Sequence, residues 1–132
     1  MVMTDPLADM CTRIRNASRA KHDLVEMPTS QVKEAVAKIL RDEGYIKAYR
    51  VVDEEAHGVL KIYLRYRDDG EPVINGIRRI SKPGLRRYVG AQEMPKVLGG
   101  LGITVLTTSH GVMSGKDAQK RNVGGELICE VW

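Results

Sequence analysis

Residues 102–111 read GITVLTTSHG and organise the C-terminal half of this chain. The apolar residues at 103–106 predict a short β-strand, because β-branched side chains favour an extended backbone. The strand ends in three hydroxyl residues and His110, and Gly111 then turns the chain. Ser and Thr at such a position either hydrogen-bond the nearby backbone as turn residues or present compact donors to a ligand. The segment alone leaves both interpretations open.

The segment before it, residues 77–89, carries most of the positive charge. Residues 71–90 contain five basic residues and one acidic residue, so their net charge of +4 equals that of the whole chain. Strands are predicted at 77–81 and 85–89, joined by Pro83-Gly84, the sequence of a type II turn. A basic ribbon with an aromatic residue commonly holds a nucleic-acid backbone, and the alternative is an edge strand whose charges prevent aggregation. We favour binding, because the local sequence lacks the acidic residues needed to neutralise the ribbon, which comprises Arg78, Arg79, Lys82, Arg86, Arg87 and Tyr88.

The rest of the C-terminal half predicts further short elements. Residues 94–98 are expected to form one helical turn, and Ser114 with Asp117 has the spacing of a capping box that begins a short helix. The paired glycines at 124–125 turn the chain into a final strand at 126–132. This half therefore predicts a mostly β lobe with short helices.

Two helices are predicted in the N-terminal half. The first begins at residues 4–6, where capping side chains precede a proline, and the second begins at 29–30 and ends at Gly44. Both show apolar residues at helical spacing. These positions are Leu7, Met10, Cys11, Ile14 and Ala17 in the first helix, and Val32, Ala35, Val36, Ile39 and Leu40 in the second.

Strands are predicted at 24–27, 45–52 and 59–66, and the last two form a hairpin around a polar, glycine-containing turn. The order αβαββ predicts two helices packed on a three-stranded sheet. Residues 68–72 are polar and contain Gly and Pro, so they are the best candidate for a boundary. The expected architecture is α+β, with an N-terminal α/β lobe at 1–67 and a C-terminal β-rich lobe at 73–132.

The composition of the 132 residues restricts the class of protein. There is no Phe and only one Trp, so the core must be aliphatic. Cys11 and Cys129 form no CxxC motif, and we expect buried thiols in a reducing compartment. The N-terminus lacks the pattern of a signal peptide, and no apolar run reaches the length of a membrane span. These features predict a cytoplasmic protein with no membrane partner.

Enzyme interpretations fail on spacing. Residues 111–116 look like a phosphate loop, but only three residues separate the glycines and Asp117 follows Lys116, where such a loop needs four residues and a Ser or Thr. The histidines are too scattered to bind a metal ion. Ser109 and His110 are adjacent, so their side chains point to opposite faces of a strand and do not form a nucleophile–base pair.

A loop of compact donors beside a basic ribbon suits RNA. An RNA helix offers a wide, shallow minor groove lined with 2′-hydroxyls and base edges, which short hydroxyl side chains can enter. Arginine and lysine nearby can hold the flanking phosphates. The first helix also carries Arg13, Asn16 and Arg19 opposite its apolar side, either as a solvated face or as a second face for phosphate contact.

These motifs resemble a known family. TTSHGVM at 107–113 and GGEL at 124–127 are similar to the signature of the bacterial small-subunit ribosomal protein S8 family. Asp5-Pro6, ADM at 8–10, RIRN at 13–16 and ISKPG at 80–84 also fit this family, so the resemblance covers essentially the whole chain.

The resemblance implies a structural protein that binds the central domain of small-subunit ribosomal RNA directly and helps to assemble the subunit. Its implied partners are that RNA and neighbouring small-subunit proteins, and it implies no catalytic residue, cofactor, metal or small-molecule substrate. Some members also repress their own operon messenger RNA through the same surface. From other classes, a nucleotide-binding enzyme and a protein-binding adaptor that uses the hairpin around 60–66 remain as alternatives.

The resemblance also assigns site residues. The hydroxyl-rich segment is the family's recognition element, and Glu126 is expected either to fix that loop or to accept a hydrogen bond from a 2′-hydroxyl. The expected RNA-binding residues are Lys82, Arg86, Arg87, Tyr88, Thr107, Thr108, Ser109, His110, Gly111, Gly124, Gly125 and Glu126, with a secondary contact at Asp5, Arg13, Arg15 and Asn16. The family commonly has lysine at 110 and serine at 107, so this chain departs from the family at His110 and Thr107, and the family's ionic contact at 110 is not implied here.

Overall fold

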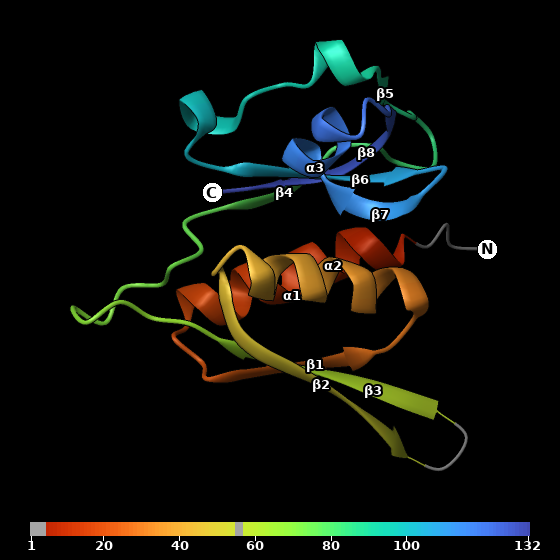
Figure 1. Cartoon of the computed structure of the whole chain (residues 1–132). Coiled ribbons are helices and arrows are strands. Elements are labelled where there is room, and N and C mark those ends of the chain that lie inside the picture. The colour runs from red at the N-terminus through yellow and green to blue at the C-terminus, as the bar shows by residue number, and fades with distance from the viewer. Residues whose placement is uncertain (1–4, 55–56) are drawn as a thin grey trace.

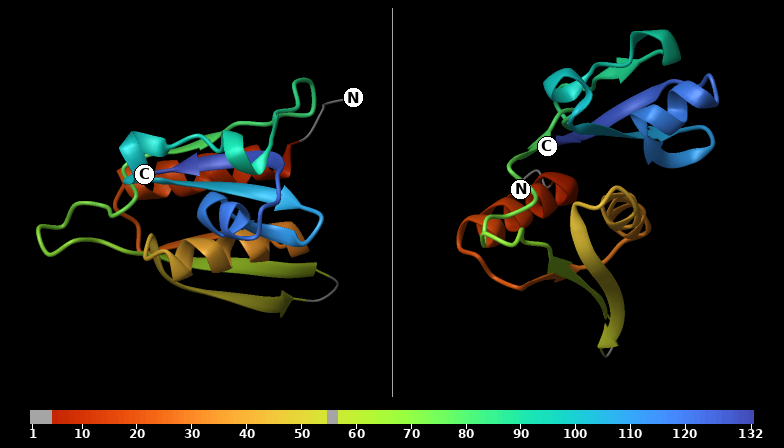
Figure 2. Two further views of the ribbon diagram at one scale, coloured as in Figure 1. Left: turned by 45° about the horizontal axis from the view of Figure 1, so that its top comes forward. Right: turned by 60° about the vertical axis from the view of Figure 1, so that its left-hand side comes forward.

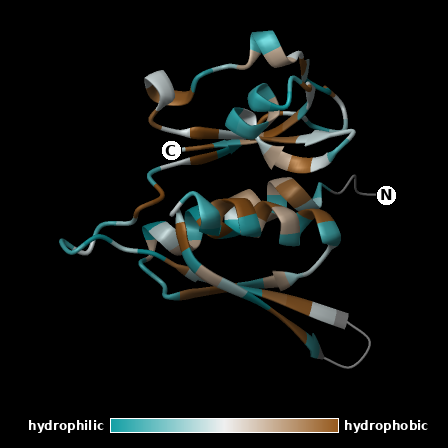
Figure 3. Ribbon diagram, in the orientation of Figure 1, coloured by the Kyte–Doolittle hydropathy of each residue, from teal (hydrophilic) through white to brown (hydrophobic). Residues whose placement is uncertain are grey.

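The computed structural model describes residues 5–54 and 57–132. The chain folds into two lobes, and the helices of the first lie between two sheets (Figures 1 and 2). The chain crosses from the first sheet to the second through residues 65–76. Apolar residues run along the helices and strands, whereas the crossing segment is largely polar (Figure 3). The α+β architecture predicted from the sequence is confirmed.

The N-terminal lobe has the predicted order of elements. These are α1 (Pro6–Arg19), β1 (Leu24–Pro28), α2 (Gln31–Asp42), β2 (Ile46–Glu54) and β3 (His57–Leu64), and the antiparallel sheet has the order β1-β3-β2. Asp5 caps α1 by accepting a hydrogen bond from the Ala8 N–H, and Ser30 caps α2 through the Lys33 N–H. The predicted Thr4 lies outside the described residues. Gly44, at φ +82°, ends α2 in the left-handed conformation expected of a residue after a helix.

The C-terminal lobe contains eight short elements. These are β4 (Ile77–Arg79), β5 (Tyr88–Val89), η1 (Ala91–Glu93), η2 (Val97–Gly100), β6 (Ile103–Thr108), β7 (Gly111–Ser114), α3 (Gly115–Lys120) and β8 (Gly125–Val131). The sheet has the order β4-β8-β6-β7, and β5 also pairs with β8. Strand β8 is therefore central, because it receives β6 on one edge and both β4 and β5 on the other.

Two sequence-based predictions for this lobe, a type II turn and a helical turn, are wrong, and one strand was missed. The strands around Pro83-Gly84 are shorter than predicted and pair with β8, and Gly84 lacks the positive φ that a type II turn needs. The helical turn at 94–98 is replaced by η1 and η2, because Met94 precedes a proline and is held extended. The short strand β7 was not predicted.

The two helices bury residues on two sides. They pack on β1 and β2 in one direction and on β4 and β7 in the other, so one apolar core spans both lobes. The buried face of α2 differs from the predicted one, because Val32 is 39% exposed while Lys33 is buried and its ammonium donates to the Pro28 carbonyl of β1. Cys11 and Cys129 are both buried in this core, as predicted.

Candidate nucleic-acid interface

The hydroxyl residues of the opening segment lie at the tip of the β6–β7 hairpin, which we call the hydroxyl turn (residues 107–111). Thr108 pairs with Gly111 across the hairpin, so Ser109 and His110 form the two-residue turn. The Thr108 hydroxyl donates to the Gly111 carbonyl at 2.8 Å and accepts the His110 N–H at 3.1 Å. Gly111, at φ +105°, adopts a conformation that favours glycine. Thr108 is therefore a turn residue, whereas Ser109 and His110 are exposed and available to a ligand.

The paired glycines act by bringing strands together. A Cβ on Gly125 would lie 2.2 Å from the Thr107 carbonyl oxygen, and one on Gly124 would lie 2.3 Å from that of Val89. Both distances are shorter than any contact that a real Cβ makes, so a residue other than glycine would force the backbone to shift at either position. Gly124 and Gly125 therefore set the close packing of β8 against β5 and the hydroxyl turn, and they do so through the backbone.

Three candidate residues share one face of the sheet. Glu126 of β8 lies opposite Tyr88 of β5 on one side and Thr107 of β6 on the other. Directly opposed residues of antiparallel strands project to the same face. With about 4.8 Å between neighbouring strands, the backbones at Tyr88 and Thr107 are about 10 Å apart. The hydroxyl turn and the residues after Gly84 thus lie at one end of the lobe (Figures 1 and 2).

Glu126 has a defined set of partners. Its Oε2 accepts hydrogen bonds from the buried Ser81 hydroxyl and from Arg86 Nη1, the latter at 3.0 Å. The hydrogen bond from Ser81 lowers the pKa of Glu126, and Arg86 lowers it further. Its described contacts hold the segment around residues 81–87. Ser81, which the sequence did not single out, lies at the centre of this arrangement.

The basic ribbon is less uniform than its sequence. Arg79 is nearly buried and binds Asp5 at 3.1 Å, Arg78 pairs with Glu130, and Arg86 pairs with Glu126. Acidic residues are absent from the local sequence, as expected, but carboxylates from the N-cap of α1 and from β8 neutralise three of the arginines. Among the described residues Lys82 and Arg87 form no ion pair, and both are exposed, as is Tyr88 at 70%.

The secondary candidates do not form one cluster. Asp5 is committed to capping α1 and to Arg79. Arg13 binds Asp9 and the Glu26 carbonyl, and Asn16 is exposed. These residues therefore contact different parts of the protein, and Asp5 reaches the C-terminal lobe through Arg79.

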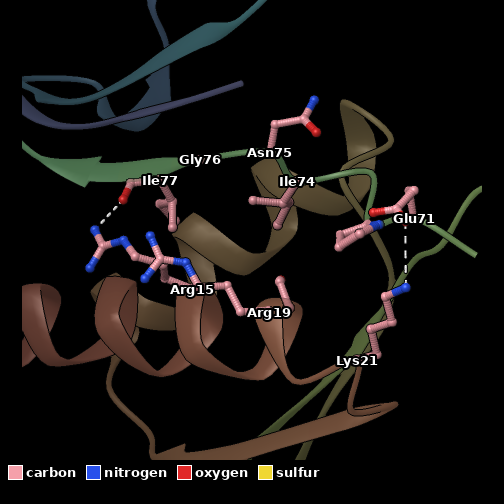
Figure 4. A pocket seen from close by; sticks show the side chains of 10 residues that line it. Arg15, Arg19, Lys21, Glu71, Ile74, Asn75, Gly76 and Ile77 are labelled. Carbon is pink, nitrogen blue, oxygen red and sulfur yellow. Dashed lines mark hydrogen bonds and ion pairs between the residues drawn. The ribbon is translucent and has the colours of Figure 1, made fainter.

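Arg15 lies in a separate cavity of about 240 Å³ between α1 and residues 71–77 (Figure 4). It donates to the Ile77 carbonyl there, and Arg19 and Lys21 line the same cavity. Lys21 binds Glu71 at 3.5 Å across the mouth of this cavity. The cavity is thus lined by cations of the first lobe and by the segment that leads to the second.

The described residues contain no group of three or more His, Cys, Asp or Glu side chains arranged to hold a metal ion. No described helix is long and apolar enough to cross a membrane. The segment that looks like a phosphate loop is not a loop, because residues 111–114 pair as β7 and Gly115 begins α3.

This two-lobed α+β fold presents exposed hydroxyl and cationic side chains at one end of its second lobe, an arrangement typical of a nucleic-acid-binding protein. Residues 5–132 match the family described as "Ribosomal protein S8", and the chain belongs to that family. The "Small ribosomal subunit protein uS8" of Lactobacillus helveticus is 56% identical over 132 residues, which is 100% of both chains. The proteins of the same name in Heliobacterium modesticaldum and Staphylococcus aureus are 54% identical over the same full length. The resemblance noted in the sequence is confirmed.

Proposed function

We propose that this chain binds a helix of small-subunit ribosomal RNA directly and serves as a structural component in assembly of the subunit, in the cytoplasm. The observation that carries this proposal is the placement of the hydroxyl turn and the basic segment on either side of β8, about 10 Å apart at the backbone. One RNA helix can meet both, because its minor groove is wide and shallow and its phosphates flank it.

The candidate residues have three roles: hydrogen bonding to the RNA, phosphate binding or stacking, and shaping of the surface. Ser109 and Thr107 discriminate the RNA by hydrogen bonds to 2′-hydroxyls or base edges, and His110 adds a donor. Lys82, Arg86 and Arg87 hold phosphates, and Tyr88 offers a face for stacking. The remaining residues shape the surface without contributing specificity of their own, and these are Thr108, Gly111, Gly124, Gly125 and Glu126.

A second, weaker contact is proposed for the N-terminal lobe. It uses the exposed Asn16 and the cations Arg13 and Arg15, whereas Asp5 acts through Arg79 inside the protein. The boundary between the lobes is placed at 68–72. This placement is supported by the pairing pattern, because no strand of one sheet pairs with a strand of the other among the described residues. Neighbouring proteins of the subunit are further partners.

The test is a filter-binding titration of the full chain with fragments of small-subunit RNA and with unrelated duplex RNA. Ser109→Ala is expected to reduce the ratio of cognate to unrelated affinity about tenfold, because a polar group on the RNA is left without a partner. Arg87→Ala is expected to weaken all RNAs and to reduce the slope of log K against log salt by about 0.7 to 0.9. Arg50→Ala is the matched control, because it removes an exposed cation from β2 in the other lobe. An unchanged affinity ratio for Ser109→Ala contradicts the assignment of the hydroxyl turn.

Regulation of the protein's own operon messenger RNA is the finer proposal. It requires a messenger fragment that presents the same RNA shape to the same surface. The proposal is supported if the two RNAs compete for one site and if Ser109→Ala weakens the binding of both. Independent binding of the two RNAs contradicts it.

A further inference from the structure

The five residues from Lys82 to Arg86 form a closed loop, which we call the basic loop (residues 82–86). At its tip, the N–H groups of Lys82 and Leu85 each donate to the other's carbonyl, at 3.0 and 2.9 Å. At its base, the Ser81 N–H donates to the Leu127 carbonyl and the Leu127 N–H donates to the Arg87 carbonyl. The residues that flank the loop, Ser81 and Arg87, therefore both pair with Leu127 of β8.

A single buried hydroxyl links the two ends of this loop. Ser81 is fully buried, its Oγ accepts the Arg87 N–H at 3.0 Å, and its hydroxyl donates to the Glu126 carboxylate. The same carboxylate oxygen accepts Arg86 Nη1. One side chain thus fixes the backbone of Arg87 and, through Glu126, the guanidinium of Arg86.

The hydrogen bonds among Ser81, Glu126 and Arg86 explain why a carboxylate can lie on the proposed RNA-binding surface. The pKa of Glu126 is lowered, so the group is ionised at neutral pH and would repel a phosphate if it were alone. Ser81 and Arg86 satisfy it from two directions. Arg86 donates to Glu126 through Nη1 and is 49% exposed, so its other N–H groups remain available to a ligand.

We propose that Ser81 is a positioning residue that aims Arg86 and Arg87 at the RNA. This inference rests on the proposed function and deepens it. Arginine side chains have among the largest rotamer entropies, so a guanidinium held before binding loses less freedom when it meets a phosphate. Ser81 does not touch the RNA, because its side chain has no exposure to solvent.

The experiment is a double-mutant cycle on RNA affinity, measured with the full chain and a small-subunit RNA fragment. Ser81→Ala is expected to weaken binding about tenfold in the natural chain. In the Arg86→Ala/Arg87→Ala background it is expected to change affinity by less than about twofold, because the residues through which it acts are gone. Equal losses in both backgrounds overturn the positioning role, as does the absence of any loss in the natural chain.

The matched control is Ser114→Ala. Ser114 is the other buried serine of this lobe, it caps α3 through the Asp117 N–H at 3.2 Å, and it contacts no residue of the basic loop among its described hydrogen bonds. Its loss should lower thermal stability to a similar degree and leave the salt dependence of RNA binding unchanged. A reduced salt slope in Ser114→Ala would show that general destabilisation mimics the effect and would overturn the proposal.

A second measurement covers the case in which Ser81→Ala does not fold. Glu126→Gln keeps the size of the side chain and an acceptor for Ser81 but removes the charge that holds Arg86. Glu126→Gln should weaken RNA binding in the natural chain and leave the RNA affinity of the Arg86→Ala variant unchanged. If the losses of affinity from the two substitutions are additive, the proposal is overturned. If the natural chain shows no preference for small-subunit RNA, the proposed function fails and this inference fails with it. That result is distinct from additivity, which removes the positioning role alone.

Discussion

Asp5→Ala is expected to destabilise the protein strongly while leaving its RNA affinity intact. The Asp5 carboxylate caps α1 through the Ala8 N–H at 3.2 Å and binds Arg79 Nε at 3.1 Å, with side-chain exposures of 16% and 9% for Asp5 and Arg79. Arg79 also donates to the Ile128 carbonyl at 2.8 Å. The pair thus connects the first helix of one lobe to β4 and β8 of the other.

The magnitude follows from the two roles of this carboxylate. Loss of a helix cap costs about 1 kcal/mol, and breaking a buried ion pair by removing one partner costs about 3–5 kcal/mol, because the other charge stays buried. Both groups retain slight exposure, so we expect about 4 kcal/mol for Asp5→Ala in total. Asp5→Asn keeps an oxygen for the cap and should cost about 1 kcal/mol less. Either loss is a large fraction of the roughly 5–15 kcal/mol that stabilises a typical domain.

The assay is urea unfolding at neutral pH, followed by circular dichroism, for the natural chain, Asp5→Ala, Asp5→Asn and Asp5→Ala/Arg79→Met. The double variant should recover part of the loss, because the methionine removes the stranded guanidinium. RNA affinity of Asp5→Asn, measured where it is folded, should stay within about twofold of the natural value. A loss of stability below about 1 kcal/mol would refute the reasoning. A large loss of RNA affinity at unchanged stability would instead place Asp5 at the RNA surface.

Three further predictions concern the C-terminal lobe and the core. Gly125→Ala should cost about 1–3 kcal/mol and weaken RNA binding, because the added Cβ would lie 2.2 Å from the Thr107 carbonyl oxygen and would displace it; unchanged urea unfolding would contradict this. The pKa of Glu126 is lowered from 4.5, so its ionised form stabilises the fold above that pH and the contribution disappears as the pH falls through the lowered pKa. The stability difference between the natural chain and Glu126→Gln should therefore shrink below pH 4.5, and a constant difference would exclude this linkage. Cys11 and Cys129, at 4% and 1% exposure, should react with a bulky thiol reagent only as fast as the protein unfolds; rapid labelling under native conditions would show an open core.

The elements that the sequence predicts well are those with local causes. The caps of α1 and α2 and the glycine after α2 act within four residues of their targets, and the structure confirms them. The alternation along β3 likewise places Leu60, Ile62 and Leu64 in the core.

The errors have non-local causes. Val32 is 39% exposed and Lys33 is buried, with its ammonium on the Pro28 carbonyl of β1, so the buried face of α2 is set by packing on other elements and not by its own periodicity. The basic ribbon looked unneutralised because its carboxylates lie 40 to 74 positions away in the chain. Helix periodicity and local charge counts contain no information about such partners.

The sequence by itself determined the family, the order of elements in the first lobe, and a surface made of hydroxyl and cationic residues, because these depend on motifs and short-range patterns. Only the tertiary structure decided which hydroxyl groups of residues 102–111 are available to a ligand. The Thr108 hydroxyl is hydrogen-bonded within the turn, and Ser109 is exposed. The tertiary structure also decided that Ser81, 45 positions from Glu126, joins the ends of the basic loop. The physical reason is that a hydrogen bond between distant residues exists only once the strands that carry them have paired around β8.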